Sequence, residues 1–232
     1  MLKKTEGIVL HRIKYSETSF IVHIYTKHEG IASFIISNAR GKRSQSAFFQ
    51  ALHIVNFEYY FNSKSSLSRI KEISFSYLPV SLHQSIQKSS IALFVSEFLY
   101  HIFSNKEENK EMYAFLRNFI IELDLATDSY SNAHIDFLLD FSVLCGIAPH
   151  NNYDEKYQFF DISKGSFVAY NAATTCNSTS SKTFSNALAK RSWGITNSER
   201  RELLRILLQY YSQHTKKIDM TRTLAILETV FR

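Results

Sequence analysis

The spacing of hydrophobic residues along this chain changes once, near residue 78. Before that point apolar side chains recur at every second position, for example at Val55, Phe57, Tyr59 and Phe61. After Pro79 they recur at intervals of three and four. The first spacing is typical of strands with one buried face, and the second of amphipathic helices. The chain is therefore predicted to be α+β, with a β domain over residues 1–78 and a mainly helical domain over residues 79–232.

The β domain is predicted to contain five short strands. They are expected around residues 8–14, 20–25, 31–37, 52–61 and 67–77. In the last of these, Leu67, Arg69 and Lys71 share their parity with Ile73, Phe75 and Tyr77, which we interpret as one face that turns from core to solvent. Five strands in so short a span suit a small closed barrel, and the oligonucleotide-binding (OB) type is the natural candidate. An SH3-like barrel has similar strand statistics, so the spacing leaves both open.

The second domain is predicted to be helical, with a short hairpin. Apolar stripes over residues 91–102, 115–123 and 135–142 predict three helices. The hairpin is expected near residues 157–170, whereas residues 172–183 are rich in Ser, Thr and Asn and are expected to form an exposed loop. Thr196-Asn197-Ser198-Glu199 is a capping-box sequence and predicts the start of a helix. A last helix is expected over residues 224–231.

All of the net charge lies in the β domain. Residues 1–78 carry 11 Lys and Arg against 5 Asp and Glu, whereas residues 79–232 carry 16 of each kind. A basic excess confined to one module indicates a polyanionic partner. No apolar run reaches the roughly 20 residues of a membrane span, and no leader-like segment follows the opening Met-Leu-Lys-Lys. We therefore expect a cytoplasmic, nucleoid-associated protein with free thiols at Cys145 and Cys176.

No pattern of residues favours catalysis or metal binding. Cys145 precedes His150 closely, but it lies at an apolar helix end, where cysteine usually acts as a small buried side chain. Asp136 and Asp140 share a helical face that we interpret as solvated, and His214 is expected to pack against or cap a helix end. The chain has no Gly-rich phosphate loop, and two isolated cysteines do not supply a zinc site. We expect no enzyme activity, no cofactor and no metal.

The best candidate site is a basic loop in the β domain. Arg40-Gly41-Lys42-Arg43 places three cations beside a glycine that lets backbone amides approach a phosphate. Arg12 and Lys14 end the first predicted strand, and Arg69 and Lys71 lie in the last. In a closed barrel these cations are expected to converge on one surface and to bind nucleic-acid backbones in a salt-sensitive way.

Aromatic residues of the barrel, such as Phe34 and Tyr59, are candidates for base stacking, although most of them must form the core. The competing interpretation of the basic loop is a merely solvated surface. The confinement of the whole net charge to this domain favours binding. Two other functions stay open: an interaction adaptor whose barrel holds an acidic protein segment, and an RNA-binding accessory module.

Several segments carry a resemblance to a known family. Three of them lie near the start: Glu6-Gly7-Ile8-Val9-Leu10, Tyr15-Ser16-Glu17-Thr18-Ser19 and Ile24-Tyr25-Thr26-Lys27-His28-Glu29-Gly30. They precede the loop Asn38–Ser44, in which a small residue is followed by Ala, Arg and further basic residues. Towards the other end, Leu203-Leu204-Arg205 leads to Tyr210-Tyr211-Ser212-Gln213-His214 and a closing helix. In this order and spacing the chain resembles, over its full length, the bacterial RecO family of DNA-repair recombination mediators.

The resemblance implies an N-terminal OB barrel and a C-terminal helical domain. It implies binding of single- and double-stranded DNA, annealing of complementary strands and, with RecR, help in loading RecA. It also implies binding of the C-terminal tail of single-stranded DNA-binding protein, and it matches Arg40, Lys42 and Arg43 to the family's basic loop. Some members carry a four-cysteine zinc motif where this chain has Cys145–Asn152 without paired cysteines, so we expect no zinc here.

Overall fold

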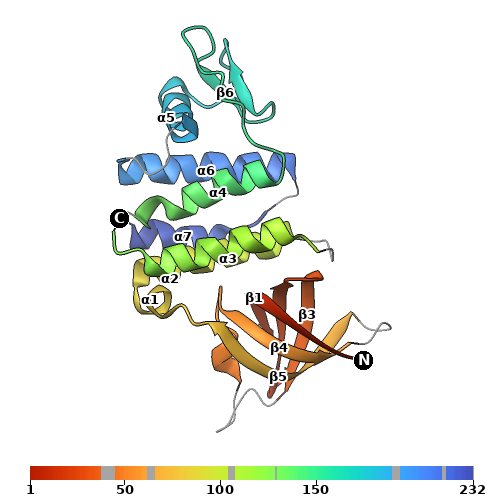
Figure 1. The fold of residues 1–232 in the computed structure, drawn as a ribbon. Helices are drawn as coiled ribbons and strands as arrows, with labels where there is room; N and C mark the ends of the chain where they lie inside the picture. Colours follow the sequence, from red (N-terminus) through yellow and green to blue (C-terminus); the bar gives the residue numbers. More distant parts are fainter. Residues whose placement is uncertain are drawn as a thin grey trace. The chain divides into compact units, whose positions relative to one another are not determined.

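Strands form in the first part of the chain and helices follow, as the change in hydrophobic spacing predicts (Figure 1). The structure is a computed structural model that describes residues 1–37, 45–61, 66–103, 108–128, 130–189, 194–215 and 218–231. The chain divides into two compact units, Met1–Ala126 and Thr127–Arg232. The domain boundary at residue 78 stays a prediction, since the compact unit that contains the barrel extends past it to Ala126.

The five strands of the first unit close into a barrel in the order β1-β2-β3-β5-β4. β3 and β5 pair in parallel, and the other neighbours are antiparallel. This is an OB-type barrel, so the predicted fold class is confirmed. The strands are β1 (Leu2–Lys14), β2 (Ser19–Thr26), β3 (Gly30–Ser37), β4 (Ile54–Tyr60) and β5 (Leu67–Tyr77).

β1 closes the barrel because it pairs with β4 through its first half and with β2 through its second. A register shift between Val9 and His11 bends the strand between these two partners. Gly7 faces the side chains of Ile24 and Phe57. A Cβ at this position would lie 2.5 Å from Cγ2 of Ile24 and 3.2 Å from Cε1 of Phe57, so there is no room for a side chain.

The interpretation of the fifth strand is wrong. Ile70 lies in the barrel core and Ile73 packs against it, although the two residues differ in parity. The register with β4 shifts between Glu58 and Tyr59, which leaves Lys71 as an extra residue on β5. This β-bulge resets the alternation, so the mixed parity does not arise from a face that turns to solvent. β4 also begins later than predicted, at Ile54.

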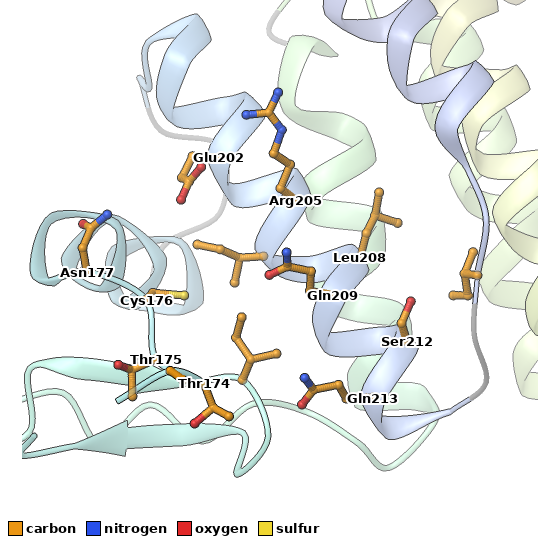
Figure 2. A pocket seen from close by; sticks show the side chains of 14 residues that line it. Thr174, Thr175, Cys176, Asn177, Glu202, Arg205, Leu208, Gln209, Ser212 and Gln213 are labelled. Atoms are coloured by element: carbon orange, nitrogen blue, oxygen red, sulfur yellow. The ribbon is translucent and has the colours of Figure 1, made fainter. Parts of the chain in front are cut away.

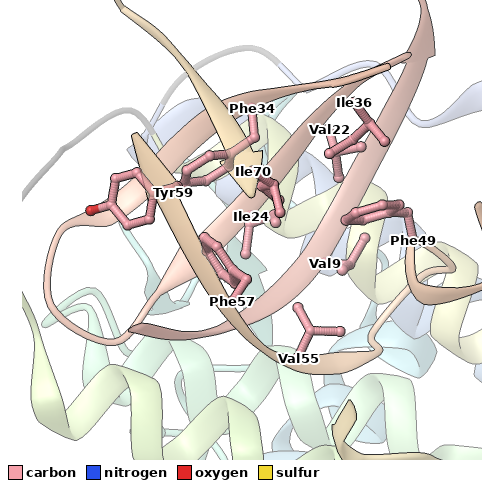
Figure 3. Close-up of a cluster of buried hydrophobic side chains, with 10 residues drawn as sticks. All are labelled: Val9, Val22, Ile24, Phe34, Ile36, Phe49, Val55, Phe57, Tyr59 and Ile70. Atoms are coloured by element: carbon pink, nitrogen blue, oxygen red, sulfur yellow. The ribbon is translucent and has the colours of Figure 1, made fainter. Parts of the chain in front are cut away.

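The barrel core is a single cluster of buried apolar and aromatic side chains (Figure 3). The Phe34 ring meets Phe57 and Tyr59 edge to face, with ring centroids 4.9 and 5.1 Å apart. Such pairs stabilise a core beyond the burial of their area. The cluster consists of Val9, Val22, Ile24, Phe34, Ile36, Phe49, Val55, Phe57, Tyr59 and Ile70.

Three helices complete the first unit: α1 (Val80–Gln84), α2 (Ile86–Ile102) and α3 (Lys110–Leu125). The Asp124 carboxylate accepts hydrogen bonds from the Tyr77 hydroxyl and the Leu82 amide, both at 2.7 Å. The buried Lys88 ammonium donates to the Asp124 carbonyl at 2.8 Å and to the Ser81 hydroxyl at 2.7 Å. These bonds join the three helices to the end of β5, so the barrel and its helices form one unit.

The described residues of the second unit form the predicted hairpin, β6 (Phe159–Asp161) with β7 (Ser166–Val168), and four α-helices. The helices are α4 (Ala133–Leu144), α5 (Ser178–Ala189), α6 (Asn197–His214) and α7 (Thr221–Val230). The predicted capping box is present at the start of α6. The Glu199 amide donates to Oγ1 of Thr196 at 3.2 Å, and the Thr196 amide donates to Oε2 of Glu199 at 2.8 Å.

The prediction of an exposed loop over residues 172–183 is wrong. α5 begins at Ser178, and Ser181 has no exposed surface. The Ser181 hydroxyl accepts a hydrogen bond from the Phe160 amide at 2.9 Å and donates to the Cys176 carbonyl at 3.3 Å. Short hydroxyl side chains can satisfy nearby backbone groups and be buried at the same time, so a polar composition did not indicate exposure here.

The two cysteines are free, as expected, but Cys145 is exposed rather than buried. It is the C-cap of α4, and Gly146 follows it with a φ of 70°. The helix therefore ends at this residue and its side chain leaves the apolar stripe. His214 packs as predicted: its ring centroid lies 4.1 Å from that of Tyr210, and its Nε2 lies 2.8 Å from the Ile162 carbonyl oxygen.

Candidate nucleic-acid interface

The described residues on either side of the basic loop lie near the end of β1. Arg40, Lys42 and Arg43 themselves lie outside the described residues. β3 ends at Ser37, which pairs with Ser19 of β2. The chain is described again from Gln45, immediately before a short 3-10 helix, Ser46–Phe48.

Arg12 and Lys14 lie at the same rim of the barrel, at the end of β1. The register pairs Lys14 with Phe20 and Phe20 with Ile36, one residue before β3 ends. Arg12 donates from Nη1 to the Ser46 carbonyl at 3.4 Å, and its guanidinium carbon lies 4.9 Å from the centre of the Phe20 ring. Two of the predicted cations therefore stand beside the segment that carries the basic loop.

Arg69 and Lys71 lie on the outside of β5. Arg69 pairs with Ile35 of β3 and with Tyr60 of β4. The Lys71 ammonium lies 3.5 Å from the Glu58 carboxylate and 3.6 Å from that of Glu72. The charge of Glu72, followed by that of Glu58, raises the pKa of Lys71. The structure thus connects Arg12 to Ser46, and Lys14 through Phe20 to Ile36, which are described residues flanking the basic loop. The charge of Lys71 is offset by two carboxylates.

Helix α2 covers part of the outer barrel surface. The rings of His11 and His23 lie 4.5 and 4.8 Å from that of Tyr100, measured between centroids. Burial lowers the pKa of both histidines, so both are neutral at pH 7. The next outward-facing row joins Ile13, Ile21 and Ile35 to Arg69 through the strand register. Ile13 in this row is 42% exposed.

The prediction that Phe34 and Tyr59 stack on bases is wrong for their rings. Phe34 is fully buried and Tyr59 is 2% exposed, and both rings belong to the core. Reasoning from the sequence missed Phe20, the ring beneath Arg12. The signal was present, because the short turn at residues 15–18 places Lys14 opposite Phe20 in a hairpin. Phe20 is only partly buried.

A cleft of about 750 Å³ lies in the second unit between α6 and residues 173–177 (Figure 2). Ile206 and Leu208 contribute apolar surface, while Thr174 and Gln209 contribute hydrogen-bonding groups. Among the residues of its lining that the structure describes, Arg205 is the one cation, and its Nη2 pairs with Oε1 of Glu228 at 2.7 Å. This described lining suits an uncharged or peptide-like ligand.

Within the described ranges, no three His, Cys, Asp or Glu side chains gather as a metal would need. The absence of zinc stays a prediction. None of the helices that the structure describes is long and apolar enough to cross a membrane.

The amino-acid sequence matches two protein-family profiles, one over the barrel and one over the helical region. The profile described as Recombination protein O N terminal matches residues 1–78, and the one described as Recombination protein O C terminal matches residues 83–223. The chain belongs to the Recombination protein O family. The resemblance to RecO that the sequence motifs carry is therefore confirmed.

Curated relatives agree with this family over their full length. A "DNA repair protein RecO" of Phocaeicola vulgatus is 34% identical over 240 residues, and that of Bacteroides fragilis is 33% identical over 242 residues, each covering 100% of both chains. The "DNA repair protein RecO" of Flavobacterium psychrophilum is 31% identical over 236 residues and covers 98% of both. All five strands of the barrel lie within the Recombination protein O N-terminal match.

The hairpin in the Recombination protein O C-terminal region is held by side-chain hydrogen bonds. Asn152 forms a two-way pair with the backbone of Phe167, at 3.0 Å as donor and 2.8 Å as acceptor. Oδ1 of the buried Asp161 accepts from the Ser163 amide at 3.0 Å and hydroxyl at 2.6 Å. Burial raises the pKa of Asp161, but hydrogen bonds from Ser163 and Lys164 outweigh it and leave that pKa below its usual value.

Replacing Asp161 by alanine is expected to lower the free energy of unfolding by about 1–3 kcal/mol, because buried donors lose their acceptor. Asp161 contributes stability above the ordinary Asp pKa and loses it as pH falls below that value. Thermal unfolding of wild type and variant, followed by circular dichroism over a pH series, measures both effects. Asp154→Ala is the matched control. Its carboxylate also accepts hydrogen bonds from backbone amides, those of Lys156 and Tyr157, but it is exposed.

The predicted absence of zinc has a test of its own. A fall in the wild-type Tm when EDTA is added would show that a metal contributes to stability.

Proposed function

We propose that this protein is a DNA-repair and recombination mediator that binds single- and double-stranded DNA through the basic rim of its barrel. Membership of the Recombination protein O family is the observation that carries this proposal. Support also comes from Arg12 and Lys14, which the structure connects to Ser46 and, through Phe20, to Ile36, on either side of the segment that holds Arg40, Lys42 and Arg43.

The proposed mechanism is electrostatic. Two complementary strands repel each other through their phosphates, and cations held at one rim neutralise both backbones when the strands are bound together. Base pairing then proceeds between strands that are already close. Such annealing needs no covalent step, so the protein acts without catalysing a chemical reaction.

The finer assignments follow the family. We propose that the protein works in the cytoplasm at the nucleoid, binds the C-terminal tail of single-stranded DNA-binding protein, and acts with RecR to help load RecA onto coated single strands. In this division of roles the basic barrel binds DNA, and the neutral helical region binds protein partners.

An annealing assay with the full chain tests the proposal. Two complementary, dye-labelled oligonucleotides coated with single-stranded DNA-binding protein should pair faster when the protein is added. The strands should stay uncleaved when divalent metal is present. Equal or tighter binding of RNA, without faster annealing, would favour an RNA accessory module. Displacement of DNA from the barrel by an acidic peptide that binds more tightly would favour an adaptor.

A further inference from the structure

A second cavity lies in the barrel wall, away from the basic rim. It has a volume of about 290 Å³ and is placed where β3 and β4 do not pair directly. Its walls come from the start of β1, the turn between β2 and β3, β3 itself, the end of β4 and the start of β5. Among the residues that line it are Lys3, Glu29, Ser33, Tyr59, Phe61 and Ser68. Its size is at the lower end for ligand pockets and suits one small ring system.

Polar groups in this cavity are held in fixed positions. The Glu29 carboxylate pairs with the Lys3 ammonium through Oε1 and accepts the Tyr59 hydroxyl through Oε2 at 2.8 Å. Figure 3 shows the Tyr59 hydroxyl pointing away from the core cluster that holds its ring. Burial, followed by the bond to Glu29, raises the pKa of Tyr59, so the hydroxyl stays protonated and donates to Glu29.

An exposed aromatic ring completes the cavity. Phe61 is 36% exposed, and the Lys3 ammonium lies 3.9 Å from the centre of its ring. Because a carboxylate can accept more than two hydrogen bonds, Glu29 retains capacity towards a ligand. The cavity therefore offers an aromatic wall, a fixed acceptor and hydroxyl groups, a combination that suits a planar ligand with N–H donors.

The neighbouring position on β5 supplies a phosphate contact. Ser68 lines the cavity, and successive side chains of a strand point to opposite faces. Arg69 is therefore directed to the outside, where it is exposed. Across the part of the chain that the structure describes, no carboxylate pairs with Arg69, whereas Lys71 pairs with two. A backbone phosphate on Arg69 would place the attached base next to the opening beside Ser68.

We propose that this cavity takes one unpaired base of a bound DNA single strand, with the adjoining phosphate on Arg69. The inference rests on the proposed function and adds a contact that only an unstacked base can make. A free phosphate is disfavoured in the cavity itself because the charge of Lys3 is already paired with Glu29. Bases that carry an amino group can donate to Glu29. The site thus favours single strands over duplexes.

Photo-crosslinking and binding variants test this assignment in the full chain. A single-stranded oligonucleotide with one photoreactive base should crosslink to the peptide that contains Phe61. Phe61→Ala should weaken binding of a dC oligomer about 10-fold, the size of one lost base–aromatic contact, and leave both the salt slope and duplex affinity unchanged. Arg69→Ala should reduce the salt slope by about 0.7.

Lys71→Ala is the matched control. It removes the same charge from the same strand, but from a residue already paired with Glu58 and Glu72, so affinity should stay within about twofold. Equal effects of Arg69→Ala and Lys71→Ala, or a Phe61→Ala variant that binds dC and dT oligomers like the wild type, would overturn the assignment. If the basic-loop variant loses DNA binding and the cavity variants do not, the proposed function is supported and the cavity is rejected as a base site. Absence of DNA binding by the wild type would reject both.

Discussion

Alanine at Arg40, Lys42 and Arg43 together is expected to weaken single-stranded DNA binding about 100-fold at 50 mM salt. Each phosphate contact on a single strand contributes about 0.7 to the slope of log affinity against log salt, so three lost contacts should reduce that slope by about 2. The loss should shrink as salt rises, because released counterions supply less free energy. Fluorescence anisotropy over a salt series measures both quantities.

The control removes three cations that already face carboxylates. Lys71, Lys110 and Arg205 lie 3.5, 3.8 and 2.7 Å from Glu58, Glu108 and Glu228 respectively. Their triple alanine variant has the same net charge as the basic-loop variant. We expect its affinity to change little, since paired surface cations release few counterions. If both triple variants lose affinity equally, net charge and not the basic loop governs binding.

Acidification is expected to destabilise the first unit through His53. This side chain is 2% exposed, its Nδ1 lies 3.1 Å from the Phe48 carbonyl oxygen, and its ring meets that of His83 at 4.5 Å between centroids. Burial first, and the charge of His83 second, lower the pKa of His53 to about 4. The neutral imidazole is therefore the form that the fold accepts.

The sign of the pH effect follows from this lowered pKa. The unfolded chain binds the His53 proton near pH 6.5, whereas the folded chain resists it down to about pH 4. Stability is therefore complete above pH 6.5 and falls as pH drops through this window, with a loss of about 3 kcal/mol at its lower end. Urea unfolding at pH 7.5, 6 and 5 measures the loss.

His53→Asn removes the titration while keeping a donor for the Phe48 carbonyl. Its free energy of unfolding should be lower than that of the wild type at pH 7.5 but should change less between pH 7.5 and 5. His134 offers a comparison in the second unit, where burial, followed by the charge of Arg200, lowers its pKa to about 3. His134→Asn should leave the acid sensitivity of the first unit unchanged. A pH dependence in His53→Asn that equals the wild type would contradict the role of this side chain.

The β-bulge at Lys71 illustrates why part of the barrel could not be predicted. Period-two spacing identified the strands, but a bulge inserts one residue without any change in composition. Whether Arg69 and Lys71 face solvent or core depends on which residue of β4 lies opposite each of them. The same limitation affected residues 172–183, where the composition predicts exposed serines. Ser181 is buried because its hydroxyl forms hydrogen bonds with the backbone of Phe160 and Cys176.

The sequence by itself determined the order of a barrel followed by helices, the start of α6, and the segment with the greatest density of cations. These follow from local spacing and local hydrogen bonds, which a single segment contains in full. The tertiary structure alone decided which cations are available to bind a phosphate. Lys71 is offset by acids of two strands, Arg12 lies on Phe20, and Glu29 meets Lys3 and Tyr59 from three different segments. Charge and stacking act through space, and strand register, not sequence distance, sets which side chains meet.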